Sequence, residues 1–146
     1  MSLVADRKSR KILGIEAAGR HGDGVKARVD TVAVMLKNGI DVDEAGGGSI
    51  WVSANNVELL ENLDEGFDFD EAGDGDIELD LANVVGDMNS DEAIKASEED
   101  EGDIIADLRS IEVTETLNND GIELEETGDG DLFADLRSVT AVDNDG

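Results

Sequence analysis

A unit of about 27 residues recurs along almost the whole sequence. The copies align on an apolar residue that follows a glycine-rich stretch, and the intervals between these residues are 25, 27, 27 and 28. Every copy is also apolar two, four and seven positions further on. A repeat of this length predicts supersecondary units that stack on one another and share one continuous core. The aligned residues are Val25, Ile50, Ile77, Ile104 and Leu132.

Within each copy, apolar and polar residues alternate with a period of two. In the clearest copy, residues 121–142, apolar residues at 122 and 124, at 132, 134 and 136, and at 139 and 141 are separated by charged or polar ones, apart from Phe133. This pattern is typical of half-buried β-strands and predicts about three short strands per copy. We expect Gly128–Asp129–Gly130 and its equivalents to form the turn between the first two strands, with glycine at positive φ.

Two all-β architectures fit five such repeats. In a parallel β-helix, or solenoid, each repeat is one coil and the apolar columns form rows inside it. In the alternative, each repeat is an antiparallel hairpin, and five hairpins build a sandwich or a barrel. We favour the β-helix because the columns recur at near-constant spacing and no proline interrupts the chain. Residues 1–11 then form a basic N-terminal arm, and residues 12–146 form one five-repeat β domain.

One segment departs from the repeat. Between Met88 and Glu101 the sequence keeps the isoleucine that opens a copy, Ile94, but has Ala93 at the position of the usual glycine. We expect this segment to be a solvated excursion from the fold.

The composition is strongly acidic, with 38 Asp and Glu against 11 Lys and Arg and a net charge of −27. Self-repulsion on this scale argues against nucleic acid as a partner, and at molar salt it is screened because the Debye length falls to about 3 Å. The composition resembles that of proteins from extreme halophiles. The regular apolar columns favour a folded, salt-adapted protein over a disordered acidic tail. The sequence has no cysteine, no membrane-length apolar run and no signal-peptide core.

The charge is unevenly distributed along the chain. Residues 1–38 hold eight basic and four acidic residues, a net charge of +4, whereas residues 39–146 hold three basic and 34 acidic residues, a net charge of −31. A basic segment of this kind predicts docking on an acidic neighbour, and further copies of the same chain qualify. The alternation turns Trp51 outward, as an interface residue or packed under a loop. The expected interface residues are Arg7, Lys8, Arg10, Lys11 and Trp51.

The sequence is poor in catalytic groups, with one histidine, no cysteine and no tyrosine. His21 stands alone in a turn and makes a poor transition-metal site. The segments Asp107–Leu108–Arg109 and Asp135–Leu136–Arg137 place an acid and a base on the same face of successive coils. Paired carboxylates can cleave glycosidic bonds, but a surface ladder of ion pairs is the simpler interpretation. We therefore predict that the protein is not an enzyme.

Acidic residues around the turns form a candidate cation site. Carboxylate oxygens at short spacing suit Ca²⁺ or Mg²⁺, although the spacing does not match an EF-hand, and solvated acidic turns are the simpler interpretation. We expect no cofactor, with calcium or magnesium as the alternative. The candidate ligands are Glu71, Asp74, Asp76, Glu126, Asp129 and Asp131.

A family resemblance rests on the segments where one copy ends and the next begins. These are residues 38–42, Asn-Gly-Ile-Asp-Val, and residues 119–124, Asn-Asp-Gly-Ile-Glu-Leu, together with strands that open as Asp103–Ile104 or Asp131–Leu132. They resemble the repeats of right-handed parallel β-helices of the pectin-lyase-like superfamily, which also occur in viral tailspikes and fibres. The resemblance covers residues 12–146 and implies the coiled fold, but no catalytic set of the family's enzymes can be carried over. Bactofilins, with shorter and more uniform coils, are a poorer match.

These observations favour a non-enzymatic structural protein of a salt-adapted system. The most specific expectation is a virion component, such as a tail, fibre or capsid-decoration subunit of a virus that infects halophiles. It would assemble in the host cytoplasm as a homo-oligomer with other structural proteins, without nucleic acid or membrane partners. One alternative is a β-helix that binds or cleaves carbohydrate, with Trp51 and the Asp107/Arg109 and Asp135/Arg137 rows facing a surface glycan. The other is a cytoplasmic filament scaffold.

Overall fold

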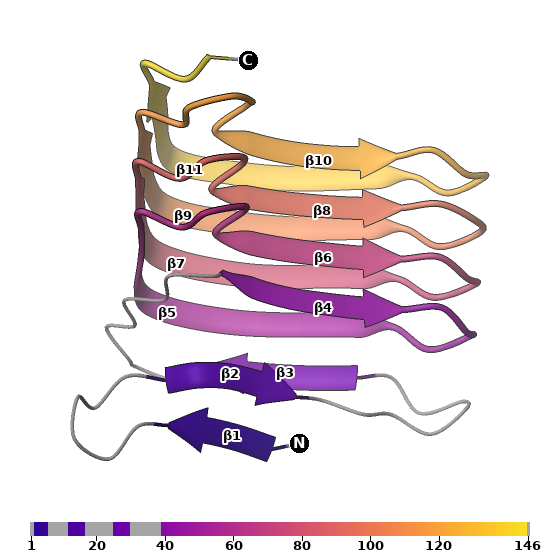
Figure 1. Ribbon diagram of the computed structural model, residues 1–146. Helices are drawn as coiled ribbons and strands as arrows, with labels where there is room; N and C mark the ends of the chain where they lie inside the picture. Colours follow the sequence, from indigo (N-terminus) through magenta and orange to yellow (C-terminus); the bar gives the residue numbers. More distant parts are fainter. Residues whose placement is uncertain (1, 6–11, 17–24, 30–38, 146) are drawn as a thin grey trace.

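A computed structural model shows an all-β chain whose parallel strands stack into a solenoid (Figure 1). It describes residues 2–5, 12–16, 25–29 and 39–145. From residue 39 onward each turn of the solenoid, which we call a coil, contains one short strand and one long strand. These strands pair in parallel from coil to coil. The predicted parallel solenoid is therefore confirmed, and the hairpin alternative is wrong.

The short and long strands form two separate parallel sheets. The short strands form a four-stranded sheet in the order β10-β8-β6-β4, and the long strands form a sheet in the order β11-β9-β7-β5-β3. A third sheet, of β1 and β2, is antiparallel. The strands are β1 Ser2–Ala5, β2 Ile12–Glu16, β3 Val25–Val29, β4 Ile40–Glu44, β5 Ile50–Leu60, β6 Phe67–Glu71, β7 Ile77–Asp87, β8 Ile94–Glu98, β9 Ile104–Thr114, β10 Ile122–Glu126 and β11 Leu132–Val142.

The apolar columns of the sequence lie opposite one another between coils. Leu81 pairs with Leu108, and Leu108 pairs with Leu136. The same register joins Ile50, Ile77 and Ile104, and all three are fully buried. Since equivalent residues of successive coils touch, the core is a set of continuous rows along the solenoid axis, as the repeat predicted.

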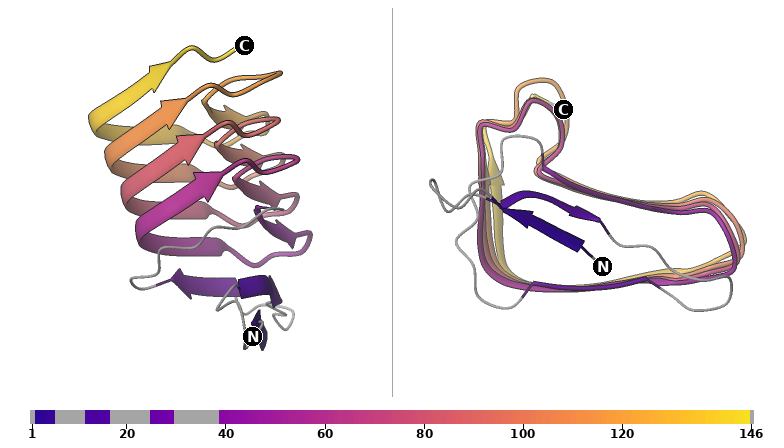
Figure 2. Two further views of the ribbon diagram at one scale, coloured as in Figure 1. Left: turned by 60° about the vertical axis from the view of Figure 1, so that its left-hand side comes forward. Right: turned by 60° about the horizontal axis from the view of Figure 1, so that its bottom comes forward.

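Each of the strands β5, β7, β9 and β11 bends once, at its seventh residue. The bend residues have left-handed backbone, with φ between 53° and 57°, and they are left out of the otherwise continuous register. Left-handed backbone is uncommon outside glycine but is tolerated by Asn. Viewed along the axis, the bend gives the coils an L-shaped outline on which they superpose (Figure 2, right). The second and third strands predicted for each copy are thus the two arms of one bent strand. The bend residues are Asn56, Asn83, Ser110 and Ser138.

The segment expected to be a solvated excursion is part of the core, so that prediction is wrong. Residues 94–98 form β8, which pairs with β6 on one side and β10 on the other. Ala93, Ile94 and Ala96 are fully buried. The loss of the usual glycine hides the repeat in the sequence, but the backbone keeps its register because the neighbouring coil makes room for the methyl group of Ala93, as described below.

The expectation that the turn glycines adopt positive φ is wrong. These glycines are needed because successive turns stack closely. A Cβ added to Gly73 would lie 1.7 Å from the carbonyl oxygen of Gly46, and one added to Gly75 would lie 1.7 Å from that of Gly48. Among the described glycines, only Gly39 has a positive φ, of 67°. The turns of successive coils therefore pack backbone to backbone, and a Cβ added at Gly73 or Gly75 would meet the backbone of the preceding coil.

A corner joins each long strand to the next short strand, and it contains a buried polar column. The side-chain amide of Asn62 donates to Asn89 Oδ1 at 2.6 Å, and Asn89 Nδ2 donates to the carbonyl oxygen of Leu59 at 3.1 Å. In the next coils, Thr116 Oγ1 donates to Asn144 Oδ1 at 2.9 Å. The corners span residues 61–66, 88–93 and 115–121, so the last is one residue longer than the others.

Candidate functional site

The end of the solenoid at β11 exposes residues that are buried in every other described coil. Leu136 is 55% exposed, whereas its register partner Leu108 is fully buried. Leu132 is exposed as well, although its register partner Ile104 is fully buried, and Val139 is only partly buried. The core columns therefore emerge at this end as an apolar surface, which we call the β11 end.

The β11 end also presents an open sheet edge. β11 pairs with β9 on one side, and no described strand pairs with its other side. An unpaired parallel edge offers backbone donors and acceptors to another strand. Exposed apolar side chains next to an open edge make this end a surface that fits strand-by-strand association.

The opposite end of the solenoid holds β3 and the β1–β2 pair (Figure 1). β3 continues the long-strand sheet, because Val25 pairs with Ile50 and Val29 with Ala54. The predicted interface residues Arg7, Lys8, Arg10 and Lys11 lie outside the described residues, as does His21. Their role in docking stays a prediction.

The acid–base rows expected on the long strands come together as an ion-pair ladder. Arg109 contacts Asp80 of the preceding coil and lies 2.8 Å from Asp107. Arg137 Nη2 lies 2.5 Å from Asp107 Oδ1, and its Nε lies 3.4 Å from Asp135. Each arginine therefore links two coils. These side chains are about one-third to two-thirds exposed, so solvent screens the pairs and their contribution to stability is small.

Trp51 points outward, as the alternation predicted, and is 44% exposed. Its register column continues with Glu78, Ile105 and Phe133. Ile105 and Phe133 are also exposed. Between β5 and β11, three of the four side chains in this column are therefore apolar, and two of them are aromatic.

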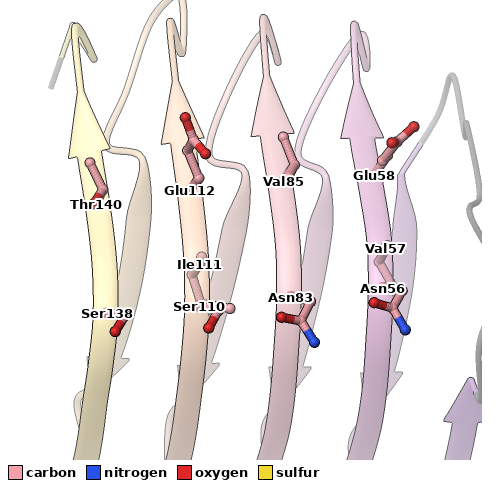
Figure 3. A pocket seen from close by; sticks show the side chains of 10 residues that line it. All are labelled: Asn56, Val57, Glu58, Asn83, Val85, Ser110, Ile111, Glu112, Ser138 and Thr140. Atoms are coloured by element: carbon pink, nitrogen blue, oxygen red, sulfur yellow. The ribbon is translucent and has the colours of Figure 1, made fainter.

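A groove runs along the outside of the bend in the long strands, and sequence reasoning missed it. Figure 3 shows that the bend residues Asn56, Asn83, Ser110 and Ser138 lie at one level on four neighbouring strands. Further along the strands, Glu58, Val85, Glu112 and Thr140 form a second row. The groove has a volume of about 520 Å³. The sequence signal for it was the polar residue at a fixed place between two apolar columns.

A second missed feature is a column of carboxylates that ends the short strands. Glu44, Glu71, Glu98 and Glu126 lie opposite one another in register. Each accepts hydrogen bonds from the backbone of the turn that follows it, at 2.7–3.3 Å. Glu71 and Glu98 are fully buried. Strict alternation along the short strands already placed these residues inward.

The calcium candidates are not gathered into one site. Glu71 binds the amides of Gly73 and Gly75, and Asp76 Oδ1 accepts from the amide of Asp103 at 3.0 Å. Within the described part of the chain, the group of three carboxylates with ligand oxygens within 4.8 Å of one another is Asp64, Glu65 and Asp91, at the corners. Calcium binding at the turns stays a prediction, and we assign no metal ligand.

Comparison with known proteins adds no relative. No family model, curated protein or solved structure matches the chain. Among its described residues, no helix is long and apolar enough to cross a lipid bilayer.

Proposed function

We propose that the protein is a non-enzymatic structural component that assembles with other chains through the β11 end. The observation that carries this proposal is the contrast between exposed Leu136 and its fully buried register partner Leu108. A strand added to β11 would bury this surface and satisfy the open backbone edge. Burial of apolar area is the main favourable term in most protein association.

Charge supports association between copies of this chain. Residues 39–146 carry a net charge of −31 and residues 1–38 a net charge of +4. A contact between two β11 ends joins two acidic bodies, whereas a head-to-tail contact brings a basic segment to an acidic one. Head-to-tail contacts are heterologous and extend into filaments when they do not close into a ring.

We further propose that the protein works at high salt and is a component of a virion. The net charge of −27 suits a protein that folds and assembles where salt screens its self-repulsion. The resemblance to right-handed β-helices of the pectin-lyase-like superfamily and to viral tailspikes favours a tail, fibre or capsid-decoration subunit over a cytoplasmic scaffold. A scaffold would form filaments from this chain alone, whereas a virion component would need other structural proteins.

Light scattering after size exclusion in molar NaCl tests association directly. The wild-type chain is expected to run as a species larger than its 15.4 kDa monomer, in a concentration-dependent manner. Leu136→Ser should shift the population towards monomer while the circular dichroism spectrum stays unchanged. The matched control is Leu63→Ser, on a corner, where Leu63 is 79% exposed. A wild-type chain that stays monomeric at every concentration contradicts the proposal.

Binding of a surface glycan is the second candidate, and the outward column of Trp51 and Phe133 favours it. Aromatic faces with exposed edges are common sugar-stacking platforms, because they combine a large apolar face with a low entropy of ordering. Glycan-array binding that is lost in Trp51→Ala would support this function. Absence of binding to every polysaccharide tested would remove it.

A further inference from the structure

The carboxylate column inside the solenoid has more acceptor atoms than the described structure supplies donors. One oxygen of Glu71 accepts from the amides of Gly73 and Gly75, both at 3.2 Å, and one oxygen of Glu98 accepts from those of Asp100 and Gly102, at 3.0 and 3.3 Å. The other oxygens, Glu71 Oε1, Glu98 Oε2 and Glu126 Oε2, are buried without a hydrogen-bond partner. A buried carboxylate oxygen without a donor is costly, so these atoms need a ligand that carries positive charge or a hydrogen.

No basic side chain of the described residues serves this column. Residues 39–145 contain three basic residues, and each is engaged on an outer face. Lys95 Nζ lies 3.0 Å from Asp68 and 3.4 Å from Asp70, while Arg109 and Arg137 belong to the ion-pair ladder of the long strands. The turns that follow Glu71, Glu98 and Glu126 add further acids, which are Asp74, Asp76, Glu99, Asp100, Glu101, Asp103, Asp129 and Asp131.

Adjacent carboxylates are close enough to influence each other. Strands of a parallel sheet lie about 4.8 Å apart, so four glutamates in register form a line of like charges. When like charges share a buried site, one group keeps its proton, as in carboxylate dyads. The backbone amides donate to one oxygen of each carboxylate and leave the other oxygen of Glu71, Glu98 and Glu126 without a donor.

We propose that the column is a proton-binding site, in which Glu71 donates a carboxylic hydrogen to Glu44 and Glu126 donates one to Glu98. This arrangement gives each orphaned oxygen a partner: Glu71 Oε1 and Glu126 Oε2 become donors, and Glu98 Oε2 becomes an acceptor. The folded chain then holds protons that an unfolded chain of the same composition releases as soon as the pH exceeds the ordinary pKa of a glutamate side chain.

The direction of the pKa shifts agrees with this arrangement. Burial, with the neighbouring Glu44 carboxyl, raises the pKa of Glu71 to about 7. Burial and the neighbouring Glu98 carboxyl also raise the pKa of Glu126. For Glu71 the folded chain binds a proton between about pH 4.5 and 7 that the unfolded chain has lost, so stability is greatest below this window and falls as pH rises through it.

The substitution Glu71→Gln tests the site, because the amide keeps the acceptor for Gly73 and Gly75 and donates permanently towards Glu44. Between pH 5 and 7, the folding equilibrium constant of the wild type should fall by up to about tenfold per pH unit more than that of Glu71→Gln. At pH 8 the variant should be the more stable protein. Glu112→Gln, which removes one exposed charge on β9, is the matched control and should keep the wild-type slope.

Infrared spectroscopy of the folded protein provides a readout that does not depend on stability. At pH 6 the wild type should show the carbonyl band of a protonated carboxylic acid, reduced in Glu71→Gln and retained in Glu112→Gln. Absence of this band, or equal pH slopes for Glu71→Gln and Glu112→Gln, overturns the proposal. So does a rise in melting temperature with CaCl₂ that Glu71→Gln abolishes, because the column would then hold a metal ion in place of protons.

Discussion

Gly86 and Ala93 share one packing position, because a Cβ added to Gly86 would lie 2.6 Å from the Cβ of Ala93. In the preceding coil the glycine is at the corner and the larger residue is on the long strand. There Gly66 packs against Leu59, and a Cβ added to Gly66 would lie 3.0 Å from Leu59 Cβ. In the coil after, Gly121 packs against Val113 in the same way. The glycine of this pair is therefore at the corner in two coils and on the long strand in the coil between them, and the two positions are in contact in all three.

This exchange predicts strong coupling between the two positions. Gly86→Val alone should destabilise the fold by about 1–3 kcal/mol, because the new side chain meets Ala93. Ala93→Gly alone should cost about 1 kcal/mol, because it adds backbone entropy and removes a buried methyl group. The double variant recreates the Val113–Gly121 pair and should be more stable than the sum predicts, by about 1 kcal/mol or more in urea unfolding. Additive effects would show that the two side chains do not share this space.

The stacked turns predict a sharp difference between two glycines that lie in the turns of successive coils. Gly75→Ala should destabilise the fold by about 2–3 kcal/mol, because its Cβ would lie 1.7 Å from the carbonyl oxygen of Gly48 and backbone must move. Gly47→Ala should be neutral or stabilising by up to about 1 kcal/mol, because no atom lies within 4 Å of the added Cβ. Thermal unfolding at constant salt would measure both. Equal losses of stability in the two variants would mean that the conformational freedom of glycine, and not close stacking, explains why glycine occupies these positions.

The buried corner column predicts a large cost for Asn89→Leu. This change leaves the Asn62 side-chain amide and the Leu59 carbonyl oxygen without their partner, at about 1–3 kcal/mol for each buried group. The matched control is Asn83→Ser on the solvent-exposed bend, where Asn83 donates to Asn55 at 2.9 Å. Ser110 and Ser138 occupy the same bend position in later coils, so this control should lose less than about 1 kcal/mol. A small effect of Asn89→Leu on the urea midpoint would contradict a structural role for the column.

Protonation of Glu92, at a corner, is expected to make the stability of the fold depend on pH in a second way, in addition to the carboxylate column. Burial, with the neighbouring Glu123 and Asp91 carboxyls, raises the pKa of Glu92 to about 8 from an ordinary 4.5. Stability linked to this proton is present at low pH and is lost as pH rises to about 8. Glu92→Gln should therefore stabilise the protein at pH 9 relative to wild type and have little effect at pH 4.5. Urea unfolding across this range measures it, and a stability gain that is independent of pH would contradict the assignment.

The solenoid could be predicted from the sequence because the apolar residues recur at the same offsets in every copy of the repeat. Apolar residues at matching offsets, such as Leu81 and Leu108, can form rows only if the copies stack, and they do. The same reasoning failed at residues 88–101, because the compensation between Ala93 and Gly86 acts between neighbouring coils. Because Gly86 and Ala93 occupy different positions of the repeat, a comparison of the copies at each position separately does not show that they compensate each other.

The functional surfaces were harder to predict than the fold. Outward Trp51 and the Asp107–Arg137 contact followed from alternation and register alone. The carboxylate column was missed because an acidic residue in an acidic chain was interpreted as solvated, although alternation placed Glu71 inside. The bend at Asn56 and its equivalents has one sequence signal, a polar residue between two apolar columns, and this signal does not by itself indicate left-handed backbone or a groove.

The longer corner at residues 115–121 has a practical consequence. Its additional residue leaves the register of β10 with β8 and of β11 with β9 unbroken. Length changes at this position are therefore absorbed outside the hydrogen-bonded frame. A foreign peptide grafted there would be displayed at a fixed place on the surface, and grafts in successive corners would be held at intervals of about 4.8 Å by the sheet spacing.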